Sequence, residues 1–125
     1  MAHYPDPPMT AMLAVAPVAN LAAARAFFDR LGLRVAADHG EYLILTGHGT
    51  ELHLAQAAPG WLVPGRNPFG LYLRVEAVDA LYEAFQGAAI HPPKAQPWGM
   101  YEFALNGPHD MLVRVGWPIA RGRGE

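Results

Sequence analysis

The sequence of 125 residues contains no cysteine, which excludes disulfide bonds, thiolate zinc sites and a cysteine nucleophile. It also lacks an apolar run approaching the roughly 18 residues that span a bilayer. The first residues show no basic segment followed by an apolar one, so a secretory signal is not indicated. We therefore expect a cytoplasmic protein with no membrane partner.

Charged residues are scarce, because they make up 16% of the chain and leave a net charge of −2. The basic residues are scattered except for Arg121 and Arg123, so the electrostatic footprint of a nucleic-acid-binding protein is missing. Hydrophobic residues reach 52%, which is enough for one packed core. The composition predicts a single domain over residues 1–125, and the 13 glycines and 12 prolines predict short elements with many turns.

The first half of the chain predicts the element order β-α-β-β-β over about residues 10–57. An apolar run at residues 10–17 predicts a buried strand, and Asn20 occupies the N-cap position of a helix that ends at Gly32. Three alternating runs follow, with glycine-bearing turns between them that are typical of hairpins. These runs occupy residues 33–37, 42–46 and 51–55.

A Gly/Pro-rich linker at about residues 58–67 leads to a second, similar unit at about residues 68–117. In this unit Asp79 is the predicted N-cap of a helix that ends at Gly87. Residues 91–96 form an extended piece whose prolines give it poor strand chemistry. The clear strands of this unit are predicted at residues 69–75, 101–105 and 111–115.

The most specific pattern lies at residues 96–115, QPWGMYEFALNGPHDMLVRV. It resembles the signature of the vicinal oxygen chelate superfamily and particularly its bleomycin-resistance-like branch, in which Pro-Trp-Gly precedes a Glu-Phe-Ala-Leu strand and a tight turn. Residues 20–33 and 72–85 resemble the family's first helix and its fifth strand with the second helix. The resemblance implies an α+β fold of two β-α-β-β-β units, which form a glyoxalase/bleomycin-resistance-type open barrel of curved mixed sheets. It also implies a homodimer with clefts between the subunits.

The tight turn departs from the family pattern, because Asp110 stands where a glycine is usual. An aspartate adopts the left-handed backbone region at modest cost. We therefore expect the turn to form, with Asp110 in that region.

Enzymes of this family hold a divalent metal with His, Gln or Glu on the first, fifth and eighth strands, and sometimes on the fourth. The corresponding positions hold residues 12–14, Gly70 and Arg114, none of which ligates a cation, and a guanidinium repels one. Glu51 and His53 on the fourth strand alternate onto one face, but the pair alone is a weak metal site. The sequence predicts no metal, no cofactor and no catalytic residue, which favours a binding protein over an enzyme.

The resemblance places Trp98 at the ligand cleft and lets a ligand approach the backbone at Gly99. For Arg114 two roles stay open, a contact with a carboxylate or phosphate of the ligand and, as the favoured one, an internal salt bridge with Glu51 or Glu102. Core packing is the alternative for each aromatic candidate. The other candidates for the pocket wall are Tyr101, Phe103, Tyr72, Tyr42, Glu51 and His53.

These features predict a metal-free small-molecule-binding protein of the bleomycin-resistance-like type, one that sequesters an antibiotic or another aromatic compound. Two alternatives stay open: a metal-dependent glyoxalase- or dioxygenase-like enzyme, and a non-catalytic module with a vestigial pocket. Because bleomycins are cationic, Arg114 in the pocket counts against that particular ligand.

Overall fold

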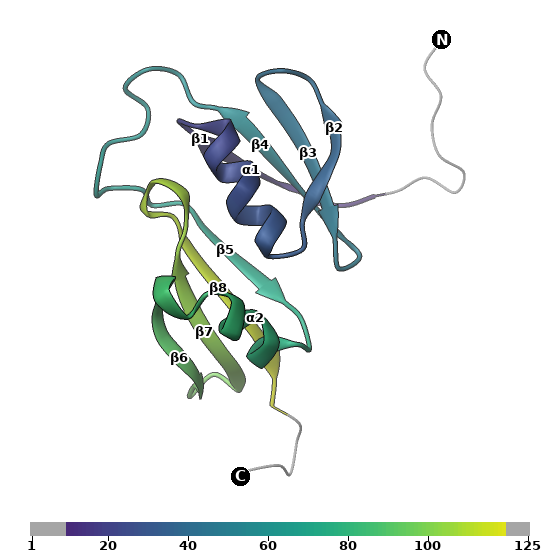
Figure 1. Cartoon of the computed structure of the whole chain (residues 1–125), viewed down its shortest axis with the longest axis vertical. Coiled ribbons are helices and arrows are strands. Elements are labelled where there is room, and N and C mark those ends of the chain that lie inside the picture. Colours follow the sequence, from purple (N-terminus) through teal and green to yellow (C-terminus); the bar gives the residue numbers. More distant parts are fainter. Residues whose placement is uncertain (1–9, 120–125) are drawn as a thin grey trace.

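The computed structural model describes residues 10–119 and shows two units of similar build, one above the other in Figure 1. The first contains β1 (Ala14–Val18), α1 (Leu21–Arg30), β2 (Arg34–Asp38), β3 (Tyr42–Gly47) and β4 (Thr50–Gln56). The second contains β5 (Gly70–Arg74), α2 (Val78–Ala84), the short 3-10 helix η1 (Gln86–Ala88), β6 (Ala89–Ala95), β7 (Met100–Asn106), the 3-10 helix η2 (Pro108–Asp110) and β8 (Leu112–Pro118). Both units have the predicted element order.

Each unit builds one four-stranded sheet, with the strand order β1-β4-β3-β2 in sheet A and β5-β8-β7-β6 in sheet B. β1 runs parallel to β4, and β5 runs parallel to β8. The other neighbouring strands are antiparallel. Neither sheet closes on itself, so the predicted α+β fold with two open mixed sheets is confirmed.

Helix α1 begins as the sequence predicts. The side chain of Asn20 accepts a hydrogen bond from the backbone N–H of Ala23, which satisfies one of the free donors of the first turn. Ala24 and Phe28 lie on the buried face, and Gly32 follows the helix with a φ of +87°, the left-handed value that favours glycine.

Helix α2 differs from the prediction, because Asp79 is not its N-cap. The helix begins at Val78 and is preceded by Ala77, which makes no side-chain capping bond. Asp79 instead accepts a hydrogen bond of 2.6 Å from the hydroxyl of Tyr101 on β7. The bond between Asp79 and Tyr101 thus takes the place of the expected capping bond. The first residue of the helix, Val78, is 2% exposed and packs into the core.

The extended piece at residues 91–96 forms most of a strand, β6. β6 pairs only with β7, so one of the adjacent residues Pro92 and Pro93 can face the unpaired edge, and the other lies where the pairing with β7 is interrupted between His91 and Lys94. The pairing shifts register between Ala89 and His91 and again between His91 and Lys94. The second unit therefore has its full set of four strands.

The turn before β8 takes the predicted left-handed form. Asp110 has a φ of +62°, and His109 joins it with a φ of +53°. The ring Nε2 of His109 accepts a hydrogen bond from the backbone N–H of Asn20, which ties this turn to the start of α1. A side-chain oxygen of Asp110 accepts from the backbone N–H of Gly65 in the linker.

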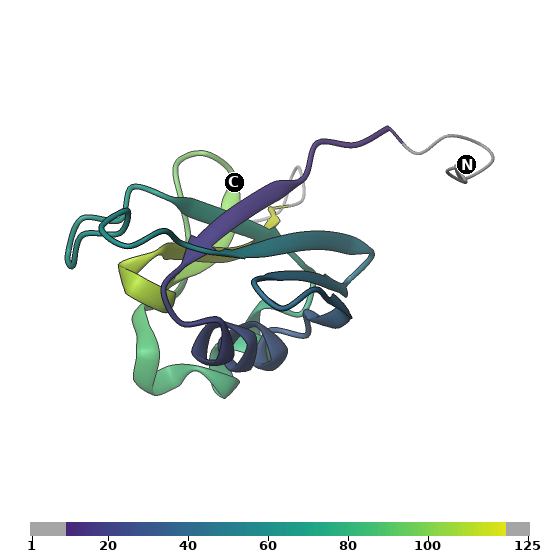
Figure 2. The ribbon, with the colours of Figure 1, turned by 90° about the horizontal axis from the view of Figure 1, so that it is seen from above.

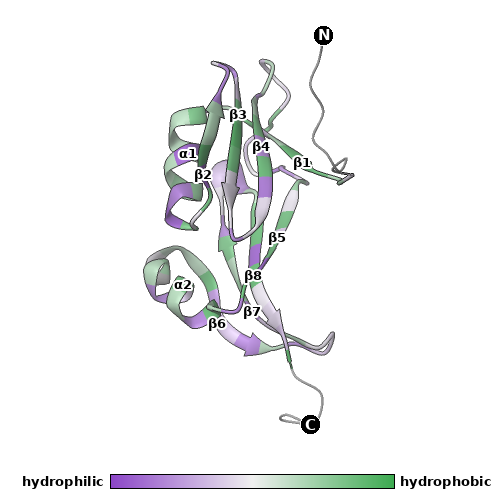
Figure 3. Ribbon diagram, turned by 90° about the vertical axis from the view of Figure 1, so that its right-hand side faces the viewer, coloured by the Kyte–Doolittle hydropathy of each residue, from purple (hydrophilic) through white to green (hydrophobic). Residues whose placement is uncertain are grey.

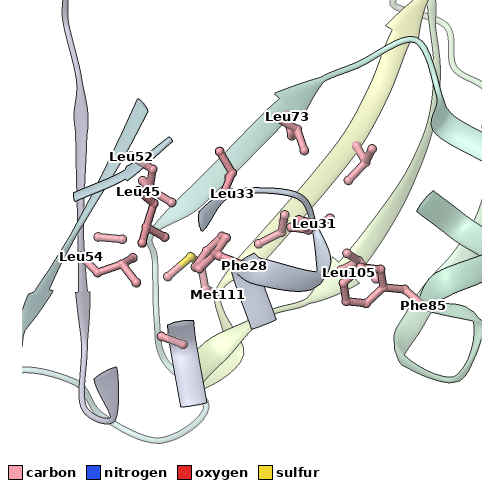
Figure 4. Packing of buried hydrophobic residues seen from close by; sticks show 14 of the residues in the cluster. Phe28, Leu31, Leu33, Leu45, Leu52, Leu54, Leu73, Phe85, Leu105 and Met111 are labelled. Atoms are coloured by element: carbon pink, nitrogen blue, oxygen red, sulfur yellow. The ribbon is translucent and has the colours of Figure 1, made fainter. Parts of the chain in front are cut away.

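A single cluster of buried side chains includes residues of both units (Figure 4). Phe28 of α1 and Phe85, which follows α2, are each 1% exposed, and the ring of Phe27 lies 5.5 Å from that of Phe85. Arg30 adds a polar contact, because its side chain donates to the Ala84 carbonyl oxygen and its guanidinium lies over the Phe85 ring. The core joins the two units through their helices.

Both helices lie on the same side of the sheets, as Figures 2 and 3 show. Within residues 10–119 no helix covers the opposite side, which we call the open face of each sheet. Side chains alternate along a strand, so every second residue points to this face. None of the helices in the described part of the chain is long and apolar enough to cross a membrane.

Candidate functional site

The open face of sheet B brings together polar and aromatic side chains from three neighbouring strands. Tyr72 of β5 lies beside Arg114 of β8, which lies beside Ala104 of β7. Glu102 of β7 lies two residues from Ala104 and is paired with Gly116 of β8. Side chains opposite each other on one face are within contact distance. This register predicts a compact group around Tyr72, Glu102 and Arg114.

Trp98 reaches this group from the turn between β6 and β7. The turn is closed by a hydrogen bond from the Gly99 N–H to the Gln96 carbonyl oxygen, and Gly99 has a φ of +83°. The indole N–H of Trp98 donates to Oε1 of Glu102, whose side chain is only 1% exposed. A buried carboxylate needs donors, so this bond stabilises Glu102 and fixes the indole, which stays 56% exposed.

Tyr72 lies against the same carboxyl group. Burial, followed by the charge and hydrogen bonding of the adjacent Glu102, raises the pKa of Tyr72 to about 12. The phenol therefore keeps its proton well above neutral pH, next to the buried carboxyl group. A methyl group at Gly116 would collide with the Tyr72 hydroxyl and would lie 2.7 Å from Cβ of Glu102. Gly116 makes room for this arrangement, and sequence reasoning had not singled it out.

Arg114 stands next to Trp98 without an acidic partner. Its guanidinium carbon lies 5.7 Å from the centroid of the Trp98 ring. Among residues 10–119 no carboxylate oxygen lies within the 4.0 Å of an ion pair with Arg114. The favoured prediction of an internal salt bridge with Glu51 or Glu102 is therefore wrong. Glu102 is held by Trp98, and Glu51 is bound to His53 on the other sheet.

The open face of sheet A carries a second polar group, formed by Tyr42 of β3 with Glu51 and His53 of β4. The Tyr42 hydroxyl lies 2.7 Å from Nδ1 of His53, and Nε2 of His53 lies 2.6 Å from Oε2 of Glu51. A neutral imidazole with its proton on Nε2 satisfies both contacts, since Tyr42 then donates to Nδ1 and Nε2 donates to the carboxylate. Three predicted wall residues thus form one hydrogen-bonded chain.

Two predicted wall residues lie on the other side of sheet B. Phe103 is completely buried in the core, with its ring 5.5 Å from that of Tyr82. Tyr101 also points toward the helices, because its hydroxyl donates to Asp79 of α2. Both residues alternate with Glu102 along β7, so neither contributes to the open face. Tyr101 and Phe103 are therefore not part of the candidate site on the open face.

The residues present do not fit a divalent metal ion. At the metal positions that the sequence resemblance assigns, Gly70 has no side-chain ligand atom and Arg114 is a cation beside Trp98. Glu51 and His53 are bound to each other, and among residues 10–119 no third His, Cys, Asp or Glu joins them as a ligand. In the described residues no group of three or more His, Cys, Asp or Glu side chains is arranged to hold a metal ion.

A cavity of about 210 Å³ lies where the two units meet. Glu51 of sheet A and Tyr72 of sheet B both line it, so it touches one member of each polar group. Trp98 and Arg114 do not line this cavity. Its remaining lining is mostly apolar and includes Met12, Ala14, Phe28, Leu31, Leu33, Thr50, Leu52, Leu71, Leu73 and Val113.

No family model and no curated protein sequence matches this chain. Several solved structures, however, match it. A bleomycin-binding protein complexed with bleomycin is 24% identical, with a TM-score of 0.74 over 87% of this chain and 98% of that chain. The chain has the fold of the bleomycin-resistance proteins.

Two further structures extend this likeness within the glyoxalase/bleomycin-resistance fold. A bleomycin resistance determinant encoded on the transposon Tn5 is 23% identical, with a TM-score of 0.74 over 88% of this chain and 98% of that chain. A glyoxalase/bleomycin resistance protein/dioxygenase from Nocardioides is 16% identical, with a TM-score of 0.72 over 100% of this chain and 91% of that chain. The fold that the sequence predicts, that of the glyoxalase/bleomycin-resistance proteins, is confirmed.

Proposed function

We propose that this protein is a metal-free binding protein of the bleomycin-resistance-like type, which sequesters a small aromatic compound in the cytoplasm. The observation that carries the proposal is the exposed indole of Trp98, held in place by the buried Glu102 and flanked by Arg114. A large aromatic side chain usually buries its ring in the core. Here the hydrogen bond to the buried carboxyl group of Glu102 holds the indole ring in an exposed position, which is typical of a preorganised binding surface.

We further propose that the protein is a homodimer in which the open faces line the ligand clefts. β1 is an edge strand of sheet A, and exposed apolar side chains gather along and just before it. Met12 is 99% exposed, Val15 45% and Leu13 40%. Such an edge favours association with a second copy, which would cover it and enclose the neighbouring face.

Thermal unfolding in the presence of ligands tests the binding function. The probes are bleomycin and a set of planar aromatic compounds, each compared with buffer. A ligand at about 100 times its Kd stabilises a protein by about 2.7 kcal/mol, which corresponds to a rise in Tm of several degrees for a domain of this size.

Trp98→Ala is expected to lose the rise in Tm. Trp61→Ala is the matched control, because Trp61 is 75% exposed in the linker and is not among the side chains of either polar group. The proposal is wrong if no probe raises the Tm of the wild-type protein, or if Trp98→Ala responds as the wild type does.

A further inference from the structure

The open face of sheet B has an uneven distribution of charge. The charged side chains of β5 to β8 are Arg74, Lys94, Glu102 and Arg114. All four belong to the open face, because Arg74 lies two residues after Tyr72 on β5 and Lys94 is paired with Glu102. Three cations therefore share this face with one acid.

The single acid does not present its charge to a ligand. Glu102 is 1% exposed, and one of its oxygens accepts the Trp98 indole N–H. The Tyr72 side chain covers the same carboxyl group and is itself 42% exposed. Among these side chains, the Trp98 indole and part of Tyr72 are accessible on this face together with the cations.

Arg114 is the cation placed best to act together with the ring. It is half-buried, it has no carboxylate partner among residues 10–119, and its guanidinium carbon lies 5.7 Å from the Trp98 centroid. A planar ligand against the indole would thus bring a substituent within reach of the guanidinium. The guanidinium group matches carboxylates and phosphates with two parallel hydrogen bonds, whereas an ammonium group is repelled.

We propose that this face selects planar aromatic ligands that carry an anionic group, with the ring against Trp98 and the anion on Arg114. The inference rests on the proposed binding function and adds the ligand's charge to it. The same cations disfavour cationic aromatic ligands, because repulsion of the wrong partner contributes to specificity as much as attraction of the right one.

The test uses three naphthalene derivatives of one shape and different charge: naphthoate, naphthamide and naphthylmethylamine. Their Kd values for the full-length protein are measured by calorimetry at low salt. Naphthoate is expected to bind about tenfold more tightly than naphthamide, the size of one charge-assisted hydrogen-bonded contact. Naphthylmethylamine is expected to bind more weakly than naphthamide.

Arg114→Gln is expected to reduce the preference for naphthoate over naphthamide to less than about twofold while naphthamide still binds. Arg114→Lys keeps the charge and should retain part of the preference. Arg34→Gln is the matched control, because it removes an equal charge from β2 of sheet A, where Arg34 pairs with Asp29 at 3.4 Å. Arg34→Gln should leave the preference for naphthoate over naphthamide unchanged.

The outcomes separate the two proposals. If the three probes bind wild type equally well and Trp98→Ala abolishes their binding, the binding function stands and the charge selection is wrong. An unchanged preference in Arg114→Gln would also overturn the selection by Arg114. If no probe binds the wild-type protein, both proposals fail.

Discussion

Glu102 is the residue on which the candidate site depends most. Its Oε1 accepts the Trp98 indole N–H, and its Oε2 is buried without a hydrogen-bond partner of good geometry among the described residues. Glutamine is therefore a suitable replacement, because its amide oxygen can still accept from Trp98 while the negative charge is lost. The role of this residue could be anticipated only in part. The sequence indicated Glu102 as a partner for Arg114, but only the folded turn shows that Trp98 takes that place.

In Glu102→Gln we expect the pKa of Tyr72 to fall from about 12 toward its ordinary value of 10.0, because the carboxylate charge no longer opposes the phenolate. The unfolded chain releases this proton near its ordinary pKa, whereas the folded chain keeps it until about pH 12. The free energy of unfolding should thus decrease as pH rises between these values, and less so in the variant. Absorbance titration of the phenolate measures the pKa. A Tyr72 pKa that is the same in both proteins would contradict this.

At the scale of elements, β8 contains a closely packed glycine, Gly116, and no pattern in the neighbouring sequence indicates this packing. Gly116→Ala should destabilise the protein by about 1–3 kcal/mol, because the new methyl group meets Glu102 Cβ and the Tyr72 hydroxyl and has little room to move. Gly70→Ala on β5 is the control, since its nearest neighbour is the Leu112 carbonyl oxygen at an ordinary 3.5 Å. Urea unfolding gives both free energies. Equal stability of the two variants would show that the β8 position is not tightly packed.

The elements differ in how well the sequence predicts them. Helix α1 has a complete local signal, because Asn20 caps it and Gly32 ends it. In α2 the expected cap, Asp79, is bound by a tyrosine from β7, a contact that has no signature in the local sequence. β6 is hard to predict because Pro92 and Pro93 disfavour a strand unless it lies at an edge and its pairing is interrupted, and both are properties of the whole sheet.

At the scale of the molecule, the proposed dimer accounts for the apolar edge at β1. Light scattering coupled to size-exclusion chromatography should give twice the chain mass of 13.6 kDa. Val15→Glu should shift the protein toward the monomer, since it places a charge on the exposed edge strand. Ile90→Glu is the control, because Ile90 is 59% exposed on β6 at the far edge of sheet B. A wild-type monomer, or a dimer that Val15→Glu leaves intact, would refute the dimer.

The most direct test of ligand binding at Trp98 is the NMR signal of its indole N–H. The chain has three tryptophans, so a spectrum of ¹⁵N-labelled protein resolves the candidate residue together with two internal references. Trp61 lies in the linker, and Trp117 is paired with Tyr101 and so lies on the helix side of β8. On titration with naphthoate we predict a saturable shift of the Trp98 signal while the other two stay in place. A spectrum in which Trp98 does not respond, or in which only Trp61 or Trp117 moves, would contradict the proposed site.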